Sequence, residues 1–413
     1  MRTILASCAI FCILISCNKN DKPVPPPVTS LTPTIKSINP ASGGYNSLIT
    51  IKGTNFSSTL ANNKVTVNGV NATVQSATDT SITALVPERA GSGAVVVITP
   101  NGTISGSTFI YEPNVFVAGF ELIGNQSVAK YWRNGIPTIL GDSANANAIV
   151  VTGSDIYAAG WGPDAASGID GALYWKNGIP ITLSSSNLIH GSVLSVFVSG
   201  NDIYAAGTAI DNVTHKNIGM YWKNGVPTIL DNGAISNAAY SIFPSGNDIY
   251  VASSTWDTIY AAKLWKNGAS IPLINSSNGI SAALSVFVSG ADVYVAGSGT
   301  SGAKYWKNGN EILLSDGLAN AIVVSGNDVY VAGVGSNGTT TIAKYWKNGS
   351  AVSLTDGTHN AVANSIQVIG SDVYVAGYET IGTKDAARYW KNGTKINLTD
   401  GANQAQATSI SVQ

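Results

Sequence analysis

The pentapeptide Tyr-Trp-Lys-Asn-Gly recurs along the chain, and this repetition limits the possible folds more than any other feature. Its seven copies begin at Tyr131, Tyr174, Tyr221, Leu264, Tyr305, Tyr345 and Tyr389. Arg replaces Lys in the first copy and Leu replaces Tyr in the fourth, and a Leu follows each Gly at a fixed interval of five residues. A repeat of roughly forty residues is typical of solenoids and propellers.

A second motif, of the type Asp-Val-Tyr-Val-Ala-Gly, alternates with the first. It begins at Asp155, Asp202, Asp248, Asp292, Asp328 and Asp372, with a variant copy from Asn114. Most copies follow an apolar run and a Ser-Gly-Asn type turn, as in SVFVSGNDIYAAG from Ser195. Gly-Asn and Asn-Gly between apolar runs are strong hairpin signals, because they supply the positive φ of a tight turn. Each repeat therefore predicts four antiparallel strands.

The two ends of the repeat region indicate how it closes. The region opens at Asn114 with the second strand of a unit, and the chain stops at 409–413 with a first strand. Pairing these strands completes a blade and leaves no open unit, whereas a solenoid would need capping units at both ends. We therefore predict a seven-bladed β-propeller over residues 114–413, closed by the C-terminal strand. The repeat is similar to the SBBP-type repeat of bacterial surface proteins, with Trp-Lys-Asn-Gly in place of that family's usual Asp-x-Asn-Gly.

Residues 33–113 alternate apolar and polar residues in short runs that are separated by turn residues. This pattern predicts a sandwich of antiparallel strands, so that the whole chain is all-β. The segments PASGG from Pro40, IKGTNF from Ile51, VTVNG from Val65 and FIY from Phe109 resemble an IPT/TIG domain, an immunoglobulin-like fold. The resemblance implies a spacer or a contact surface.

The N-terminus has the features of an export signal. Residues 1–17 carry one Arg ahead of an apolar run that is too short to span a bilayer. The run ends in Leu-Ile-Ser-Cys, which resembles the lipobox of bacterial lipoproteins and implies lipidation at Cys17. Asn18 after the Cys implies the outer membrane, and the stretch from Lys19 to Lys22 is loosely similar to surface-export signals of Bacteroidetes lipoproteins. The Pro-rich residues 18–32 predict an extended tether.

Composition narrows the function. Charged residues make up 11% of the chain and the formal net charge is -1, so no basic surface points to nucleic acid. All three cysteines precede residue 18, which excludes disulfides and cysteine metal sites from the body of the protein. No spacing of His or acidic residues predicts a metal site or a cofactor.

The repeated aromatic residues have two interpretations. Trp132, Trp175, Trp222, Trp265, Trp306, Trp346 and Trp390 are either a ring of sugar-stacking platforms or the packing between blades. Adjacent residues on a strand face opposite sides, so Tyr305 and Trp306 are expected to fill different blade seams. We favour the structural role, because burying a Trp contributes more free energy than stacking one ligand ring. The repeated Asp residues are likewise expected to hold turns.

Binding is therefore expected where the repeat is broken. The loops between the second and third strands vary, and they open on one face of a propeller. Exposed aromatic rings beside carboxylates suit carbohydrate. The candidate ligand-binding residues are Trp161, Asp164, Asp170, His215, Trp256, Asp257, Tyr260, Tyr378 and Glu379.

No catalytic residue is predicted. The histidines His190, His215 and His359 are scattered, and neither a nucleophile elbow nor a phosphate loop is present. The sequence favours a lipid-anchored outer-membrane protein, exposed at the cell surface or facing the periplasm, that binds glycan through its propeller loops. A protein-protein scaffold of the cell envelope is the alternative. A hydrolase or lyase that uses loop carboxylates comes third.

Overall fold

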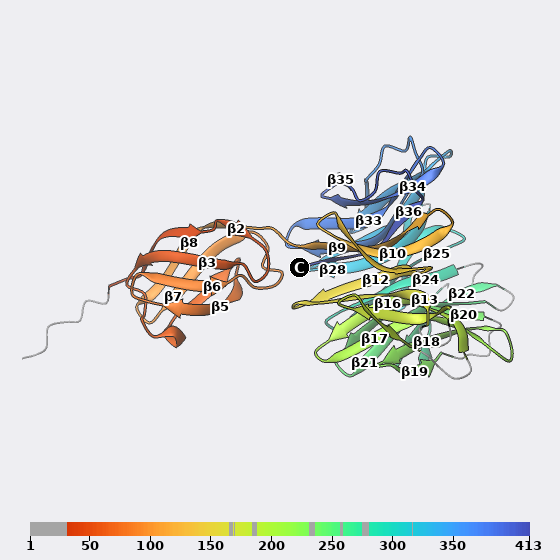
Figure 1. Cartoon of the computed structure of the whole chain (residues 1–413), viewed down its shortest axis with the longest axis horizontal. Coiled ribbons are helices and arrows are strands. Elements are labelled where there is room, and N and C mark those ends of the chain that lie inside the picture. The colour runs from red at the N-terminus through yellow and green to blue at the C-terminus, as the bar shows by residue number, and fades with distance from the viewer. Residues whose placement is uncertain are drawn as a thin grey trace, which may run out of the picture.

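The computed structural model describes residues 31–164, 168, 170–183, 188–230, 236–256, 259–274, 281–315 and 317–413. The expected signal and lipidation site at Cys17, most of the tether and Asp257 lie outside these residues. The described chain forms an N-terminal β-domain and a ring of seven four-stranded sheets (Figure 1). The predicted fold, an immunoglobulin-like sandwich followed by a seven-bladed propeller, is confirmed.

The N-terminal domain contains eight strands and one short 3-10 turn at Leu60–Asn62, and its strands follow the order β1-β3-β6-β5-β4-β7-β8-β2. Its core comes from alternate residues of these strands, such as Ile49, Ile51, Val95 and Val97. The strands are β1 (Thr34–Asn39), β2 (Ser42–Gly43), β3 (Leu48–Thr54), β4 (Lys64–Val67), β5 (Val70–Ala77), β6 (Ser81–Leu85), β7 (Gly93–Thr99) and β8 (Gly102–Tyr111).

Each propeller blade is an antiparallel sheet whose first strand lies innermost. The first blade contains β36 (Ala405–Val412), β9 (Val115–Ile123), β10 (Gln126–Arg133) and β11 (Ile136–Asp142). The second contains β12 (Asn145–Thr152), β13 (Asp155–Pro163), β14 (Asp170–Lys176) and β15 (Ile179–Thr182). The third contains β16 (Leu188–Ser199), β17 (Asp202–Asp211), β18 (Asn217–Lys223) and β19 (Val226–Ile229).

The remaining four blades repeat this order. The fourth contains β20 (Ser236–Ser245), β21 (Asp248–Trp256), β22 (Tyr260–Lys266) and β23 (Ala269–Ile271). The fifth contains β24 (Ser281–Ser289), β25 (Asp292–Gly299), β26 (Gly302–Lys307) and β27 (Asn310–Ser315). The sixth contains β28 (Leu318–Ser325), β29 (Asp328–Ser336), β30 (Thr341–Lys347) and β31 (Ser350–Ser353). The seventh contains β32 (Ala361–Ile369), β33 (Asp372–Ile381), β34 (Lys384–Lys391) and β35 (Thr394–Asn397).

The ring closes by pairing the two ends of the repeat region. Strand β36 runs antiparallel to β9, with Ile410 opposite Val117. The backbone of Asn114 and Gln413 adds a reciprocal pair of hydrogen bonds at 2.8 and 3.0 Å. The first blade is therefore built from both ends of the repeat region, and unfolding it requires the ring to open.

The repeated aromatic residues fill the seams between blades. The seven repeat Trp side chains are at most 2% exposed, and each of the seven hydrophobic clusters contains one of them. Trp306 packs between the fourth and fifth blades, whereas its neighbour Tyr305 packs between the fifth and sixth. One motif thus joins a blade to both of its neighbours.

The repeated Asp residues join the two hairpins of a blade. In the fifth blade, Asp292 accepts hydrogen bonds from the side-chain amide of Asn308 and from Lys307, both at 2.8 Å. The Asn308 amide oxygen in turn accepts the backbone N–H of Val293 at 2.8 Å. The same arrangement recurs in the second, third, fourth, sixth and seventh blades. The Asp therefore bonds the Lys-Asn pair of the neighbouring hairpin, and not the backbone amides of its own turn as the sequence suggested.

The inner strand edges are covered by side chains of the preceding blade. An innermost strand has a row of backbone groups with no strand partner, which is a liability in a sheet. The Oγ atoms of Ser195, Ser241 and Ser285 accept the N–H groups of Ile242, Val286 and Ile322 at 3.1–3.2 Å. Further such bonds are donated to Ser365, Ser409 and Ser411.

The N-terminal domain is docked at the end of the propeller that carries the tight hairpins (Figure 1). One hydrophobic cluster runs from the domain core through Tyr111 to Ile369, Tyr374 and Trp132 of the ring. The domain is thus packed on the propeller, with a continuous apolar contact between them.

We expect the change Trp306→Ala to lower the free energy of unfolding by about 3–5 kcal/mol, because it leaves a large cavity in a seam. It also removes the indole hydrogen bond to the Ile274 carbonyl. Chemical denaturation measures the effect. The matched control Trp256→Ala removes a Trp that is 40% exposed and should cost less than about 1 kcal/mol. Equal losses in the two variants would contradict the packing role.

The Asp–Lys pairs are expected to make the stability of the protein depend on pH in the acidic range. The Lys307 ammonium, followed by Asn308, lowers the pKa of Asp292 below its ordinary value of 3.8. An Asp whose pKa is lower in the folded state than in the unfolded state stabilises the fold at pH values above its unfolded-state pKa. This stabilisation is lost as the pH falls through its folded-state pKa. We therefore expect the melting temperature to fall as the pH drops below about 4. In an NMR titration, Lys307→Gln should raise the Asp292 pKa, and Lys36→Gln on the N-terminal domain should leave it unchanged.

Candidate binding face

The face opposite the N-terminal domain carries the variable loops, and we call it the loop face. It is formed by the loops between the second and third strands of each blade and by the crossovers between blades. Figure 1 shows it at the right of the propeller, away from the docked domain. All the described candidate ligand residues lie at or near these loops.

An aromatic cluster stands on the fourth blade. Trp256 ends β21 and Tyr260 begins β22, where the two residues are paired across the loop. Their ring centroids are 6.2 Å apart with a 35° tilt, and the side chains are 40% and 51% exposed. Apolar side chains that are exposed together mark interaction sites more often than single exposed residues do. This pair is the strongest candidate platform among the described residues.

A third ring of the same blade, Tyr240, lies on the innermost strand β20 and is half-buried. Burial raises the pKa of Tyr240, and the neighbouring Tyr260 raises it further. The sequence pattern alone did not single out this residue. It stands at a bulge in β20, where the other blades have Asn147, Leu194, Leu284, Asn320, Asn364 and Thr408. An aromatic residue at this position in one blade alone was the signal that would have identified it.

The candidates of the second blade lie near the end of β13 and the start of β14. Trp161 is half-buried on β13, opposite Ala172 of β14. Asp164 follows β13, and its backbone carbonyl accepts the N–H of Gly168 at 2.8 Å. Asp170 begins β14 and is exposed. A ring and a nearby exposed carboxylate are thus both present on this blade.

The third blade carries His215 in an exposed loop, with a positive φ of 55°. Asp211, at the start of this loop, accepts the backbone N–H of Thr214 at 2.6 Å and its hydroxyl at 2.8 Å. These hydrogen bonds lower the pKa of Asp211. The Asp211 carboxylate therefore holds the loop in shape and presents His215 to solvent.

Glu379 does not belong to the exposed surface. Its side chain lies within the seventh blade, where its Oε2 atom is 2.7 Å from the Lys395 ammonium and 3.9 Å from the Arg388 guanidinium. The residue is only 8% exposed. Charged side chains at this depth need such partners, so Glu379 neutralises two cations and is not free for a ligand.

Tyr378 is half-buried next to Glu379. Burial raises its pKa, and the nearby Asp385 raises it further. Asp385 itself accepts hydrogen bonds from Gln404 and Gln406 at 2.6 and 2.7 Å. These contacts join the seventh blade to the crossover and inner strand of the first blade.

The structure thus gathers the exposed candidates on three consecutive blades, the second to the fourth, while Tyr378 and Glu379 lie on the seventh. Across the described ranges, no group of three or more His, Cys, Asp or Glu side chains is arranged to hold a metal ion. Within those same ranges, no helix has the length and apolar character needed to cross a membrane.

Comparison with known proteins identifies the N-terminal domain. Residues 33–112 match the IPT/TIG domain family. No curated protein matches the chain. The expected SBBP-type repeat stays a resemblance.

Solved structures with similarity to the chain include several from Bacteroides. A Bacteroides thetaiotaomicron protein of unknown function is 12% identical, with a TM-score of 0.41 over 93% of this chain and 99% of its own. An auxiliary nutrient binding protein of the same species is 12% identical, with a TM-score of 0.30 over 88% and 85%. One from Bacteroides ovatus is 12% identical, with a TM-score of 0.21 over 73% and 95%. At these values the function has to be argued from the site itself.

The exposure of Trp256 makes it accessible to an aqueous quencher. The chain has nine Trp residues, and the seven of the repeat are buried. We therefore expect iodide to quench a minor part of the Trp emission, and Trp256→Phe to remove most of that part. Trp161→Phe should remove less, because Trp161 is half-buried. An unchanged quenchable fraction in Trp256→Phe would show that the platform is covered in solution.

Proposed function

We propose that the protein binds glycan on its loop face, with Trp256 and Tyr260 as the stacking platform. The observation that carries the proposal is the exposure of these two rings, 6.2 Å apart, on the face away from the docked domain. The C–H faces of a sugar ring pack on aromatic rings, and the polar atoms at the rim bind its hydroxyls.

The neighbouring blades extend this surface. Asp170 and His215 are exposed on the second and third blades, and Trp161 is half-buried on the second blade. A surface that spans several blades suits an oligosaccharide chain better than a single sugar. Each stacked ring contributes roughly 1–3 kcal/mol, so two or three contacts give an affinity that depends on chain length.

The place of the N-terminal domain is consistent with a lipid-anchored protein, and we include this in the proposal. The described chain begins at the side of the N-terminal domain away from the propeller (Figure 1). With Cys17 lipidated in the outer membrane and a Pro-rich tether of about fifteen residues, spanning up to roughly 45 Å, the loop face would point away from the membrane. The glycan site would then face the compartment beside the membrane, on the side away from the lipid anchor.

A protein partner is the second candidate, and one observation favours it. The outermost strands of the first three blades carry exposed aliphatic side chains: Ile136 and Ile139 on β11, Ile179 on β15, and Val226 and Ile229 on β19. A row of such residues at a sheet edge is a surface that a second chain can cover. This surface lies on the rim of the propeller and is separate from the loop face.

Affinity electrophoresis in polysaccharide gels tests the glycan proposal. The chain from residue 18 onward should be retarded by at least one plant or bacterial polysaccharide in a panel. Trp256→Ala should weaken this retardation roughly tenfold or more, because one stacking contact is lost. Ile136→Ala is the matched control, since it removes an exposed apolar side chain from the rim.

Two results would count against the proposal. Equal retardation of Trp256→Ala and of the native chain would show that Trp256 does not contribute to glycan binding. Absence of retardation in every gel, together with envelope proteins that co-purify with the native chain and are lost in Ile136→Ala, would favour the protein-partner function instead.

A further inference from the structure

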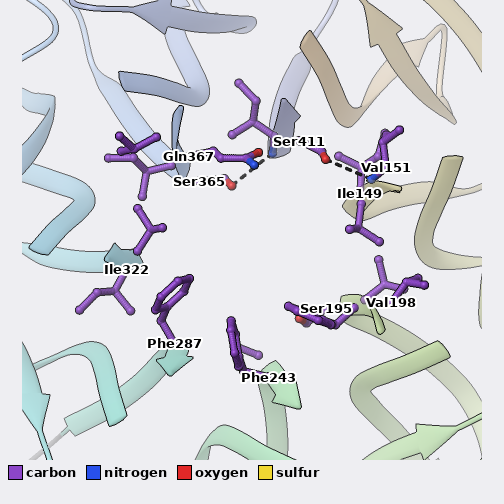
Figure 2. A pocket seen from close by; sticks show the side chains of 18 of the residues that line it. Ile149, Val151, Ser195, Val198, Phe243, Phe287, Ile322, Ser365, Gln367 and Ser411 are labelled. Carbon is purple, nitrogen blue, oxygen red and sulfur yellow. Dashed lines mark hydrogen bonds between the residues drawn. The ribbon is translucent and has the colours of Figure 1, made fainter. Parts of the chain in front are cut away.

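The repeat is also broken inside the propeller, at one position of the innermost strand. At the position that pairs with the Tyr of the second strand, or with Phe116 in the first blade, the seven blades carry Ser411, Val150, Phe197, Phe243, Phe287, Val323 and Gln367, in blade order. These residues ring a cavity of about 560 Å³ on the propeller axis, at the hairpin end (Figure 2). The cavity is therefore distinct from the loop face.

One wall of this cavity is aromatic. Phe197, Phe243 and Phe287 come from three consecutive blades, and their ring centroids are 4.9 and 4.8 Å apart. The rings are tilted by 57° and 56° and are only partly buried, so each presents an apolar surface to the cavity. Val150 and Val323 show that an aliphatic residue suffices at this position for packing. The three Phe side chains are therefore larger than the closure of the propeller requires.

The opposite wall is polar. Gln367 and Ser411 face the Phe residues across the cavity (Figure 2). The Gln367 oxygen accepts the Val412 N–H at 2.7 Å, and the Ser411 oxygen accepts the Val151 N–H at 3.1 Å. Both side chains are held in place by these bonds, while the Ser411 hydroxyl keeps a proton that it can donate.

A cation and an anion stand at the end of the cavity. Glu88 and Arg89 of the N-terminal domain also line it, with 3.5 Å between the carboxylate and the guanidinium. Arg89 has a φ of 55°, an uncommon conformation for a bulky residue. The Tyr111 hydroxyl accepts a hydrogen bond from the backbone N–H of Arg89 at 3.1 Å. Backbone strain of this kind is often held at ligand sites. Docking of the domain therefore places two opposite charges at a cavity with an aromatic wall.

We propose that this cavity binds a small zwitterion with an apolar side chain, of the α-amino acid class. The Arg89 guanidinium has five N–H donors and can bind a carboxylate while it contacts Glu88. The Glu88 carboxylate accepts the ammonium group, and the three Phe rings cover the apolar side chain. The two lining charges cancel, which suits a ligand of zero net charge better than an anion or a cation. The volume falls within the range of roughly 300–1,000 Å³ that holds small molecules.

Fluorine NMR of the full chain with three probes tests this proposal. The probes are 4-fluoro-L-phenylalanine, 3-(4-fluorophenyl)propionate, which lacks the ammonium group, and 4-fluorophenethylamine, which lacks the carboxylate. We expect the amino acid to bind about tenfold more tightly than either of the others, because each loses one charge-assisted contact. Phe243→Leu should weaken the binding of all three probes.

Two charge variants separate the roles at the end of the cavity. Arg89→Gln should abolish the preference for the amino acid over the amine, and Glu88→Gln should abolish the preference over the propionate. Lys36→Gln, an exposed charge elsewhere on the N-terminal domain, is the control and should change nothing. Thermal melts of each variant check that it is folded.

The proposal is overturned if 4-fluoro-L-phenylalanine shows no binding at millimolar concentration. It is also overturned if the propionate or the amine binds as tightly as the amino acid, or if Phe243→Leu, folded and with an unchanged melting curve, binds as the native chain does. Trp256→Ala alters the glycan site alone and should leave the binding of all three probes unaltered.

Discussion

The structure depends on the packing of two neighbouring residues, Tyr-Trp in six blades and Leu264-Trp265 in the fourth, into the two seams beside each blade. Tyr and Trp are neighbours on a strand, so they project to opposite faces, and each face of a blade is closed by a residue from that blade and one from the next. Every seam contains one repeat Trp, so each blade buries apolar side chains against both of its neighbours. The pairing of β36 with β9 closes the ring, so that the first and seventh blades are also packed against each other.

The repeat gave most of the fold in advance. Its seven copies predicted seven blades, and the unmatched strands at its two ends predicted the closure. The hydrogen bonds that join the hairpins were harder to foresee. Asp292 pairs with Lys307 and Asn308, which belong to another hairpin of the same blade, and a sequence spacing does not reveal such a side-chain contact.

The candidate site was predictable only in part. Loop residues were singled out by their variation, which correctly locates them near the loop face but does not tell exposure from burial. In the sequence, Glu379 looks like one more acidic residue of a loop. In the structure, Arg388 of β34 and Lys395 of β35 lie next to its carboxylate. Tyr240 lies at a bulge of the inner strand β20, where an aromatic residue suggests core packing, and the sequence does not reveal that Tyr260 is near enough to raise its pKa. The docking of the N-terminal domain depends on contacts between distant residues, such as Tyr111 and Tyr374, that no local pattern records.

Repeated residues build the ring, and we propose that residues departing from the repeat bind ligands. Hydrogen–deuterium exchange with and without a retained polysaccharide fragment tests this most directly. The account predicts slower exchange in the peptide that spans Trp256 to Tyr260, with unchanged exchange in the Tyr-Trp-Lys-Asn-Gly hairpins. Slower exchange in those hairpins, with none at the loop of the fourth blade, would contradict it.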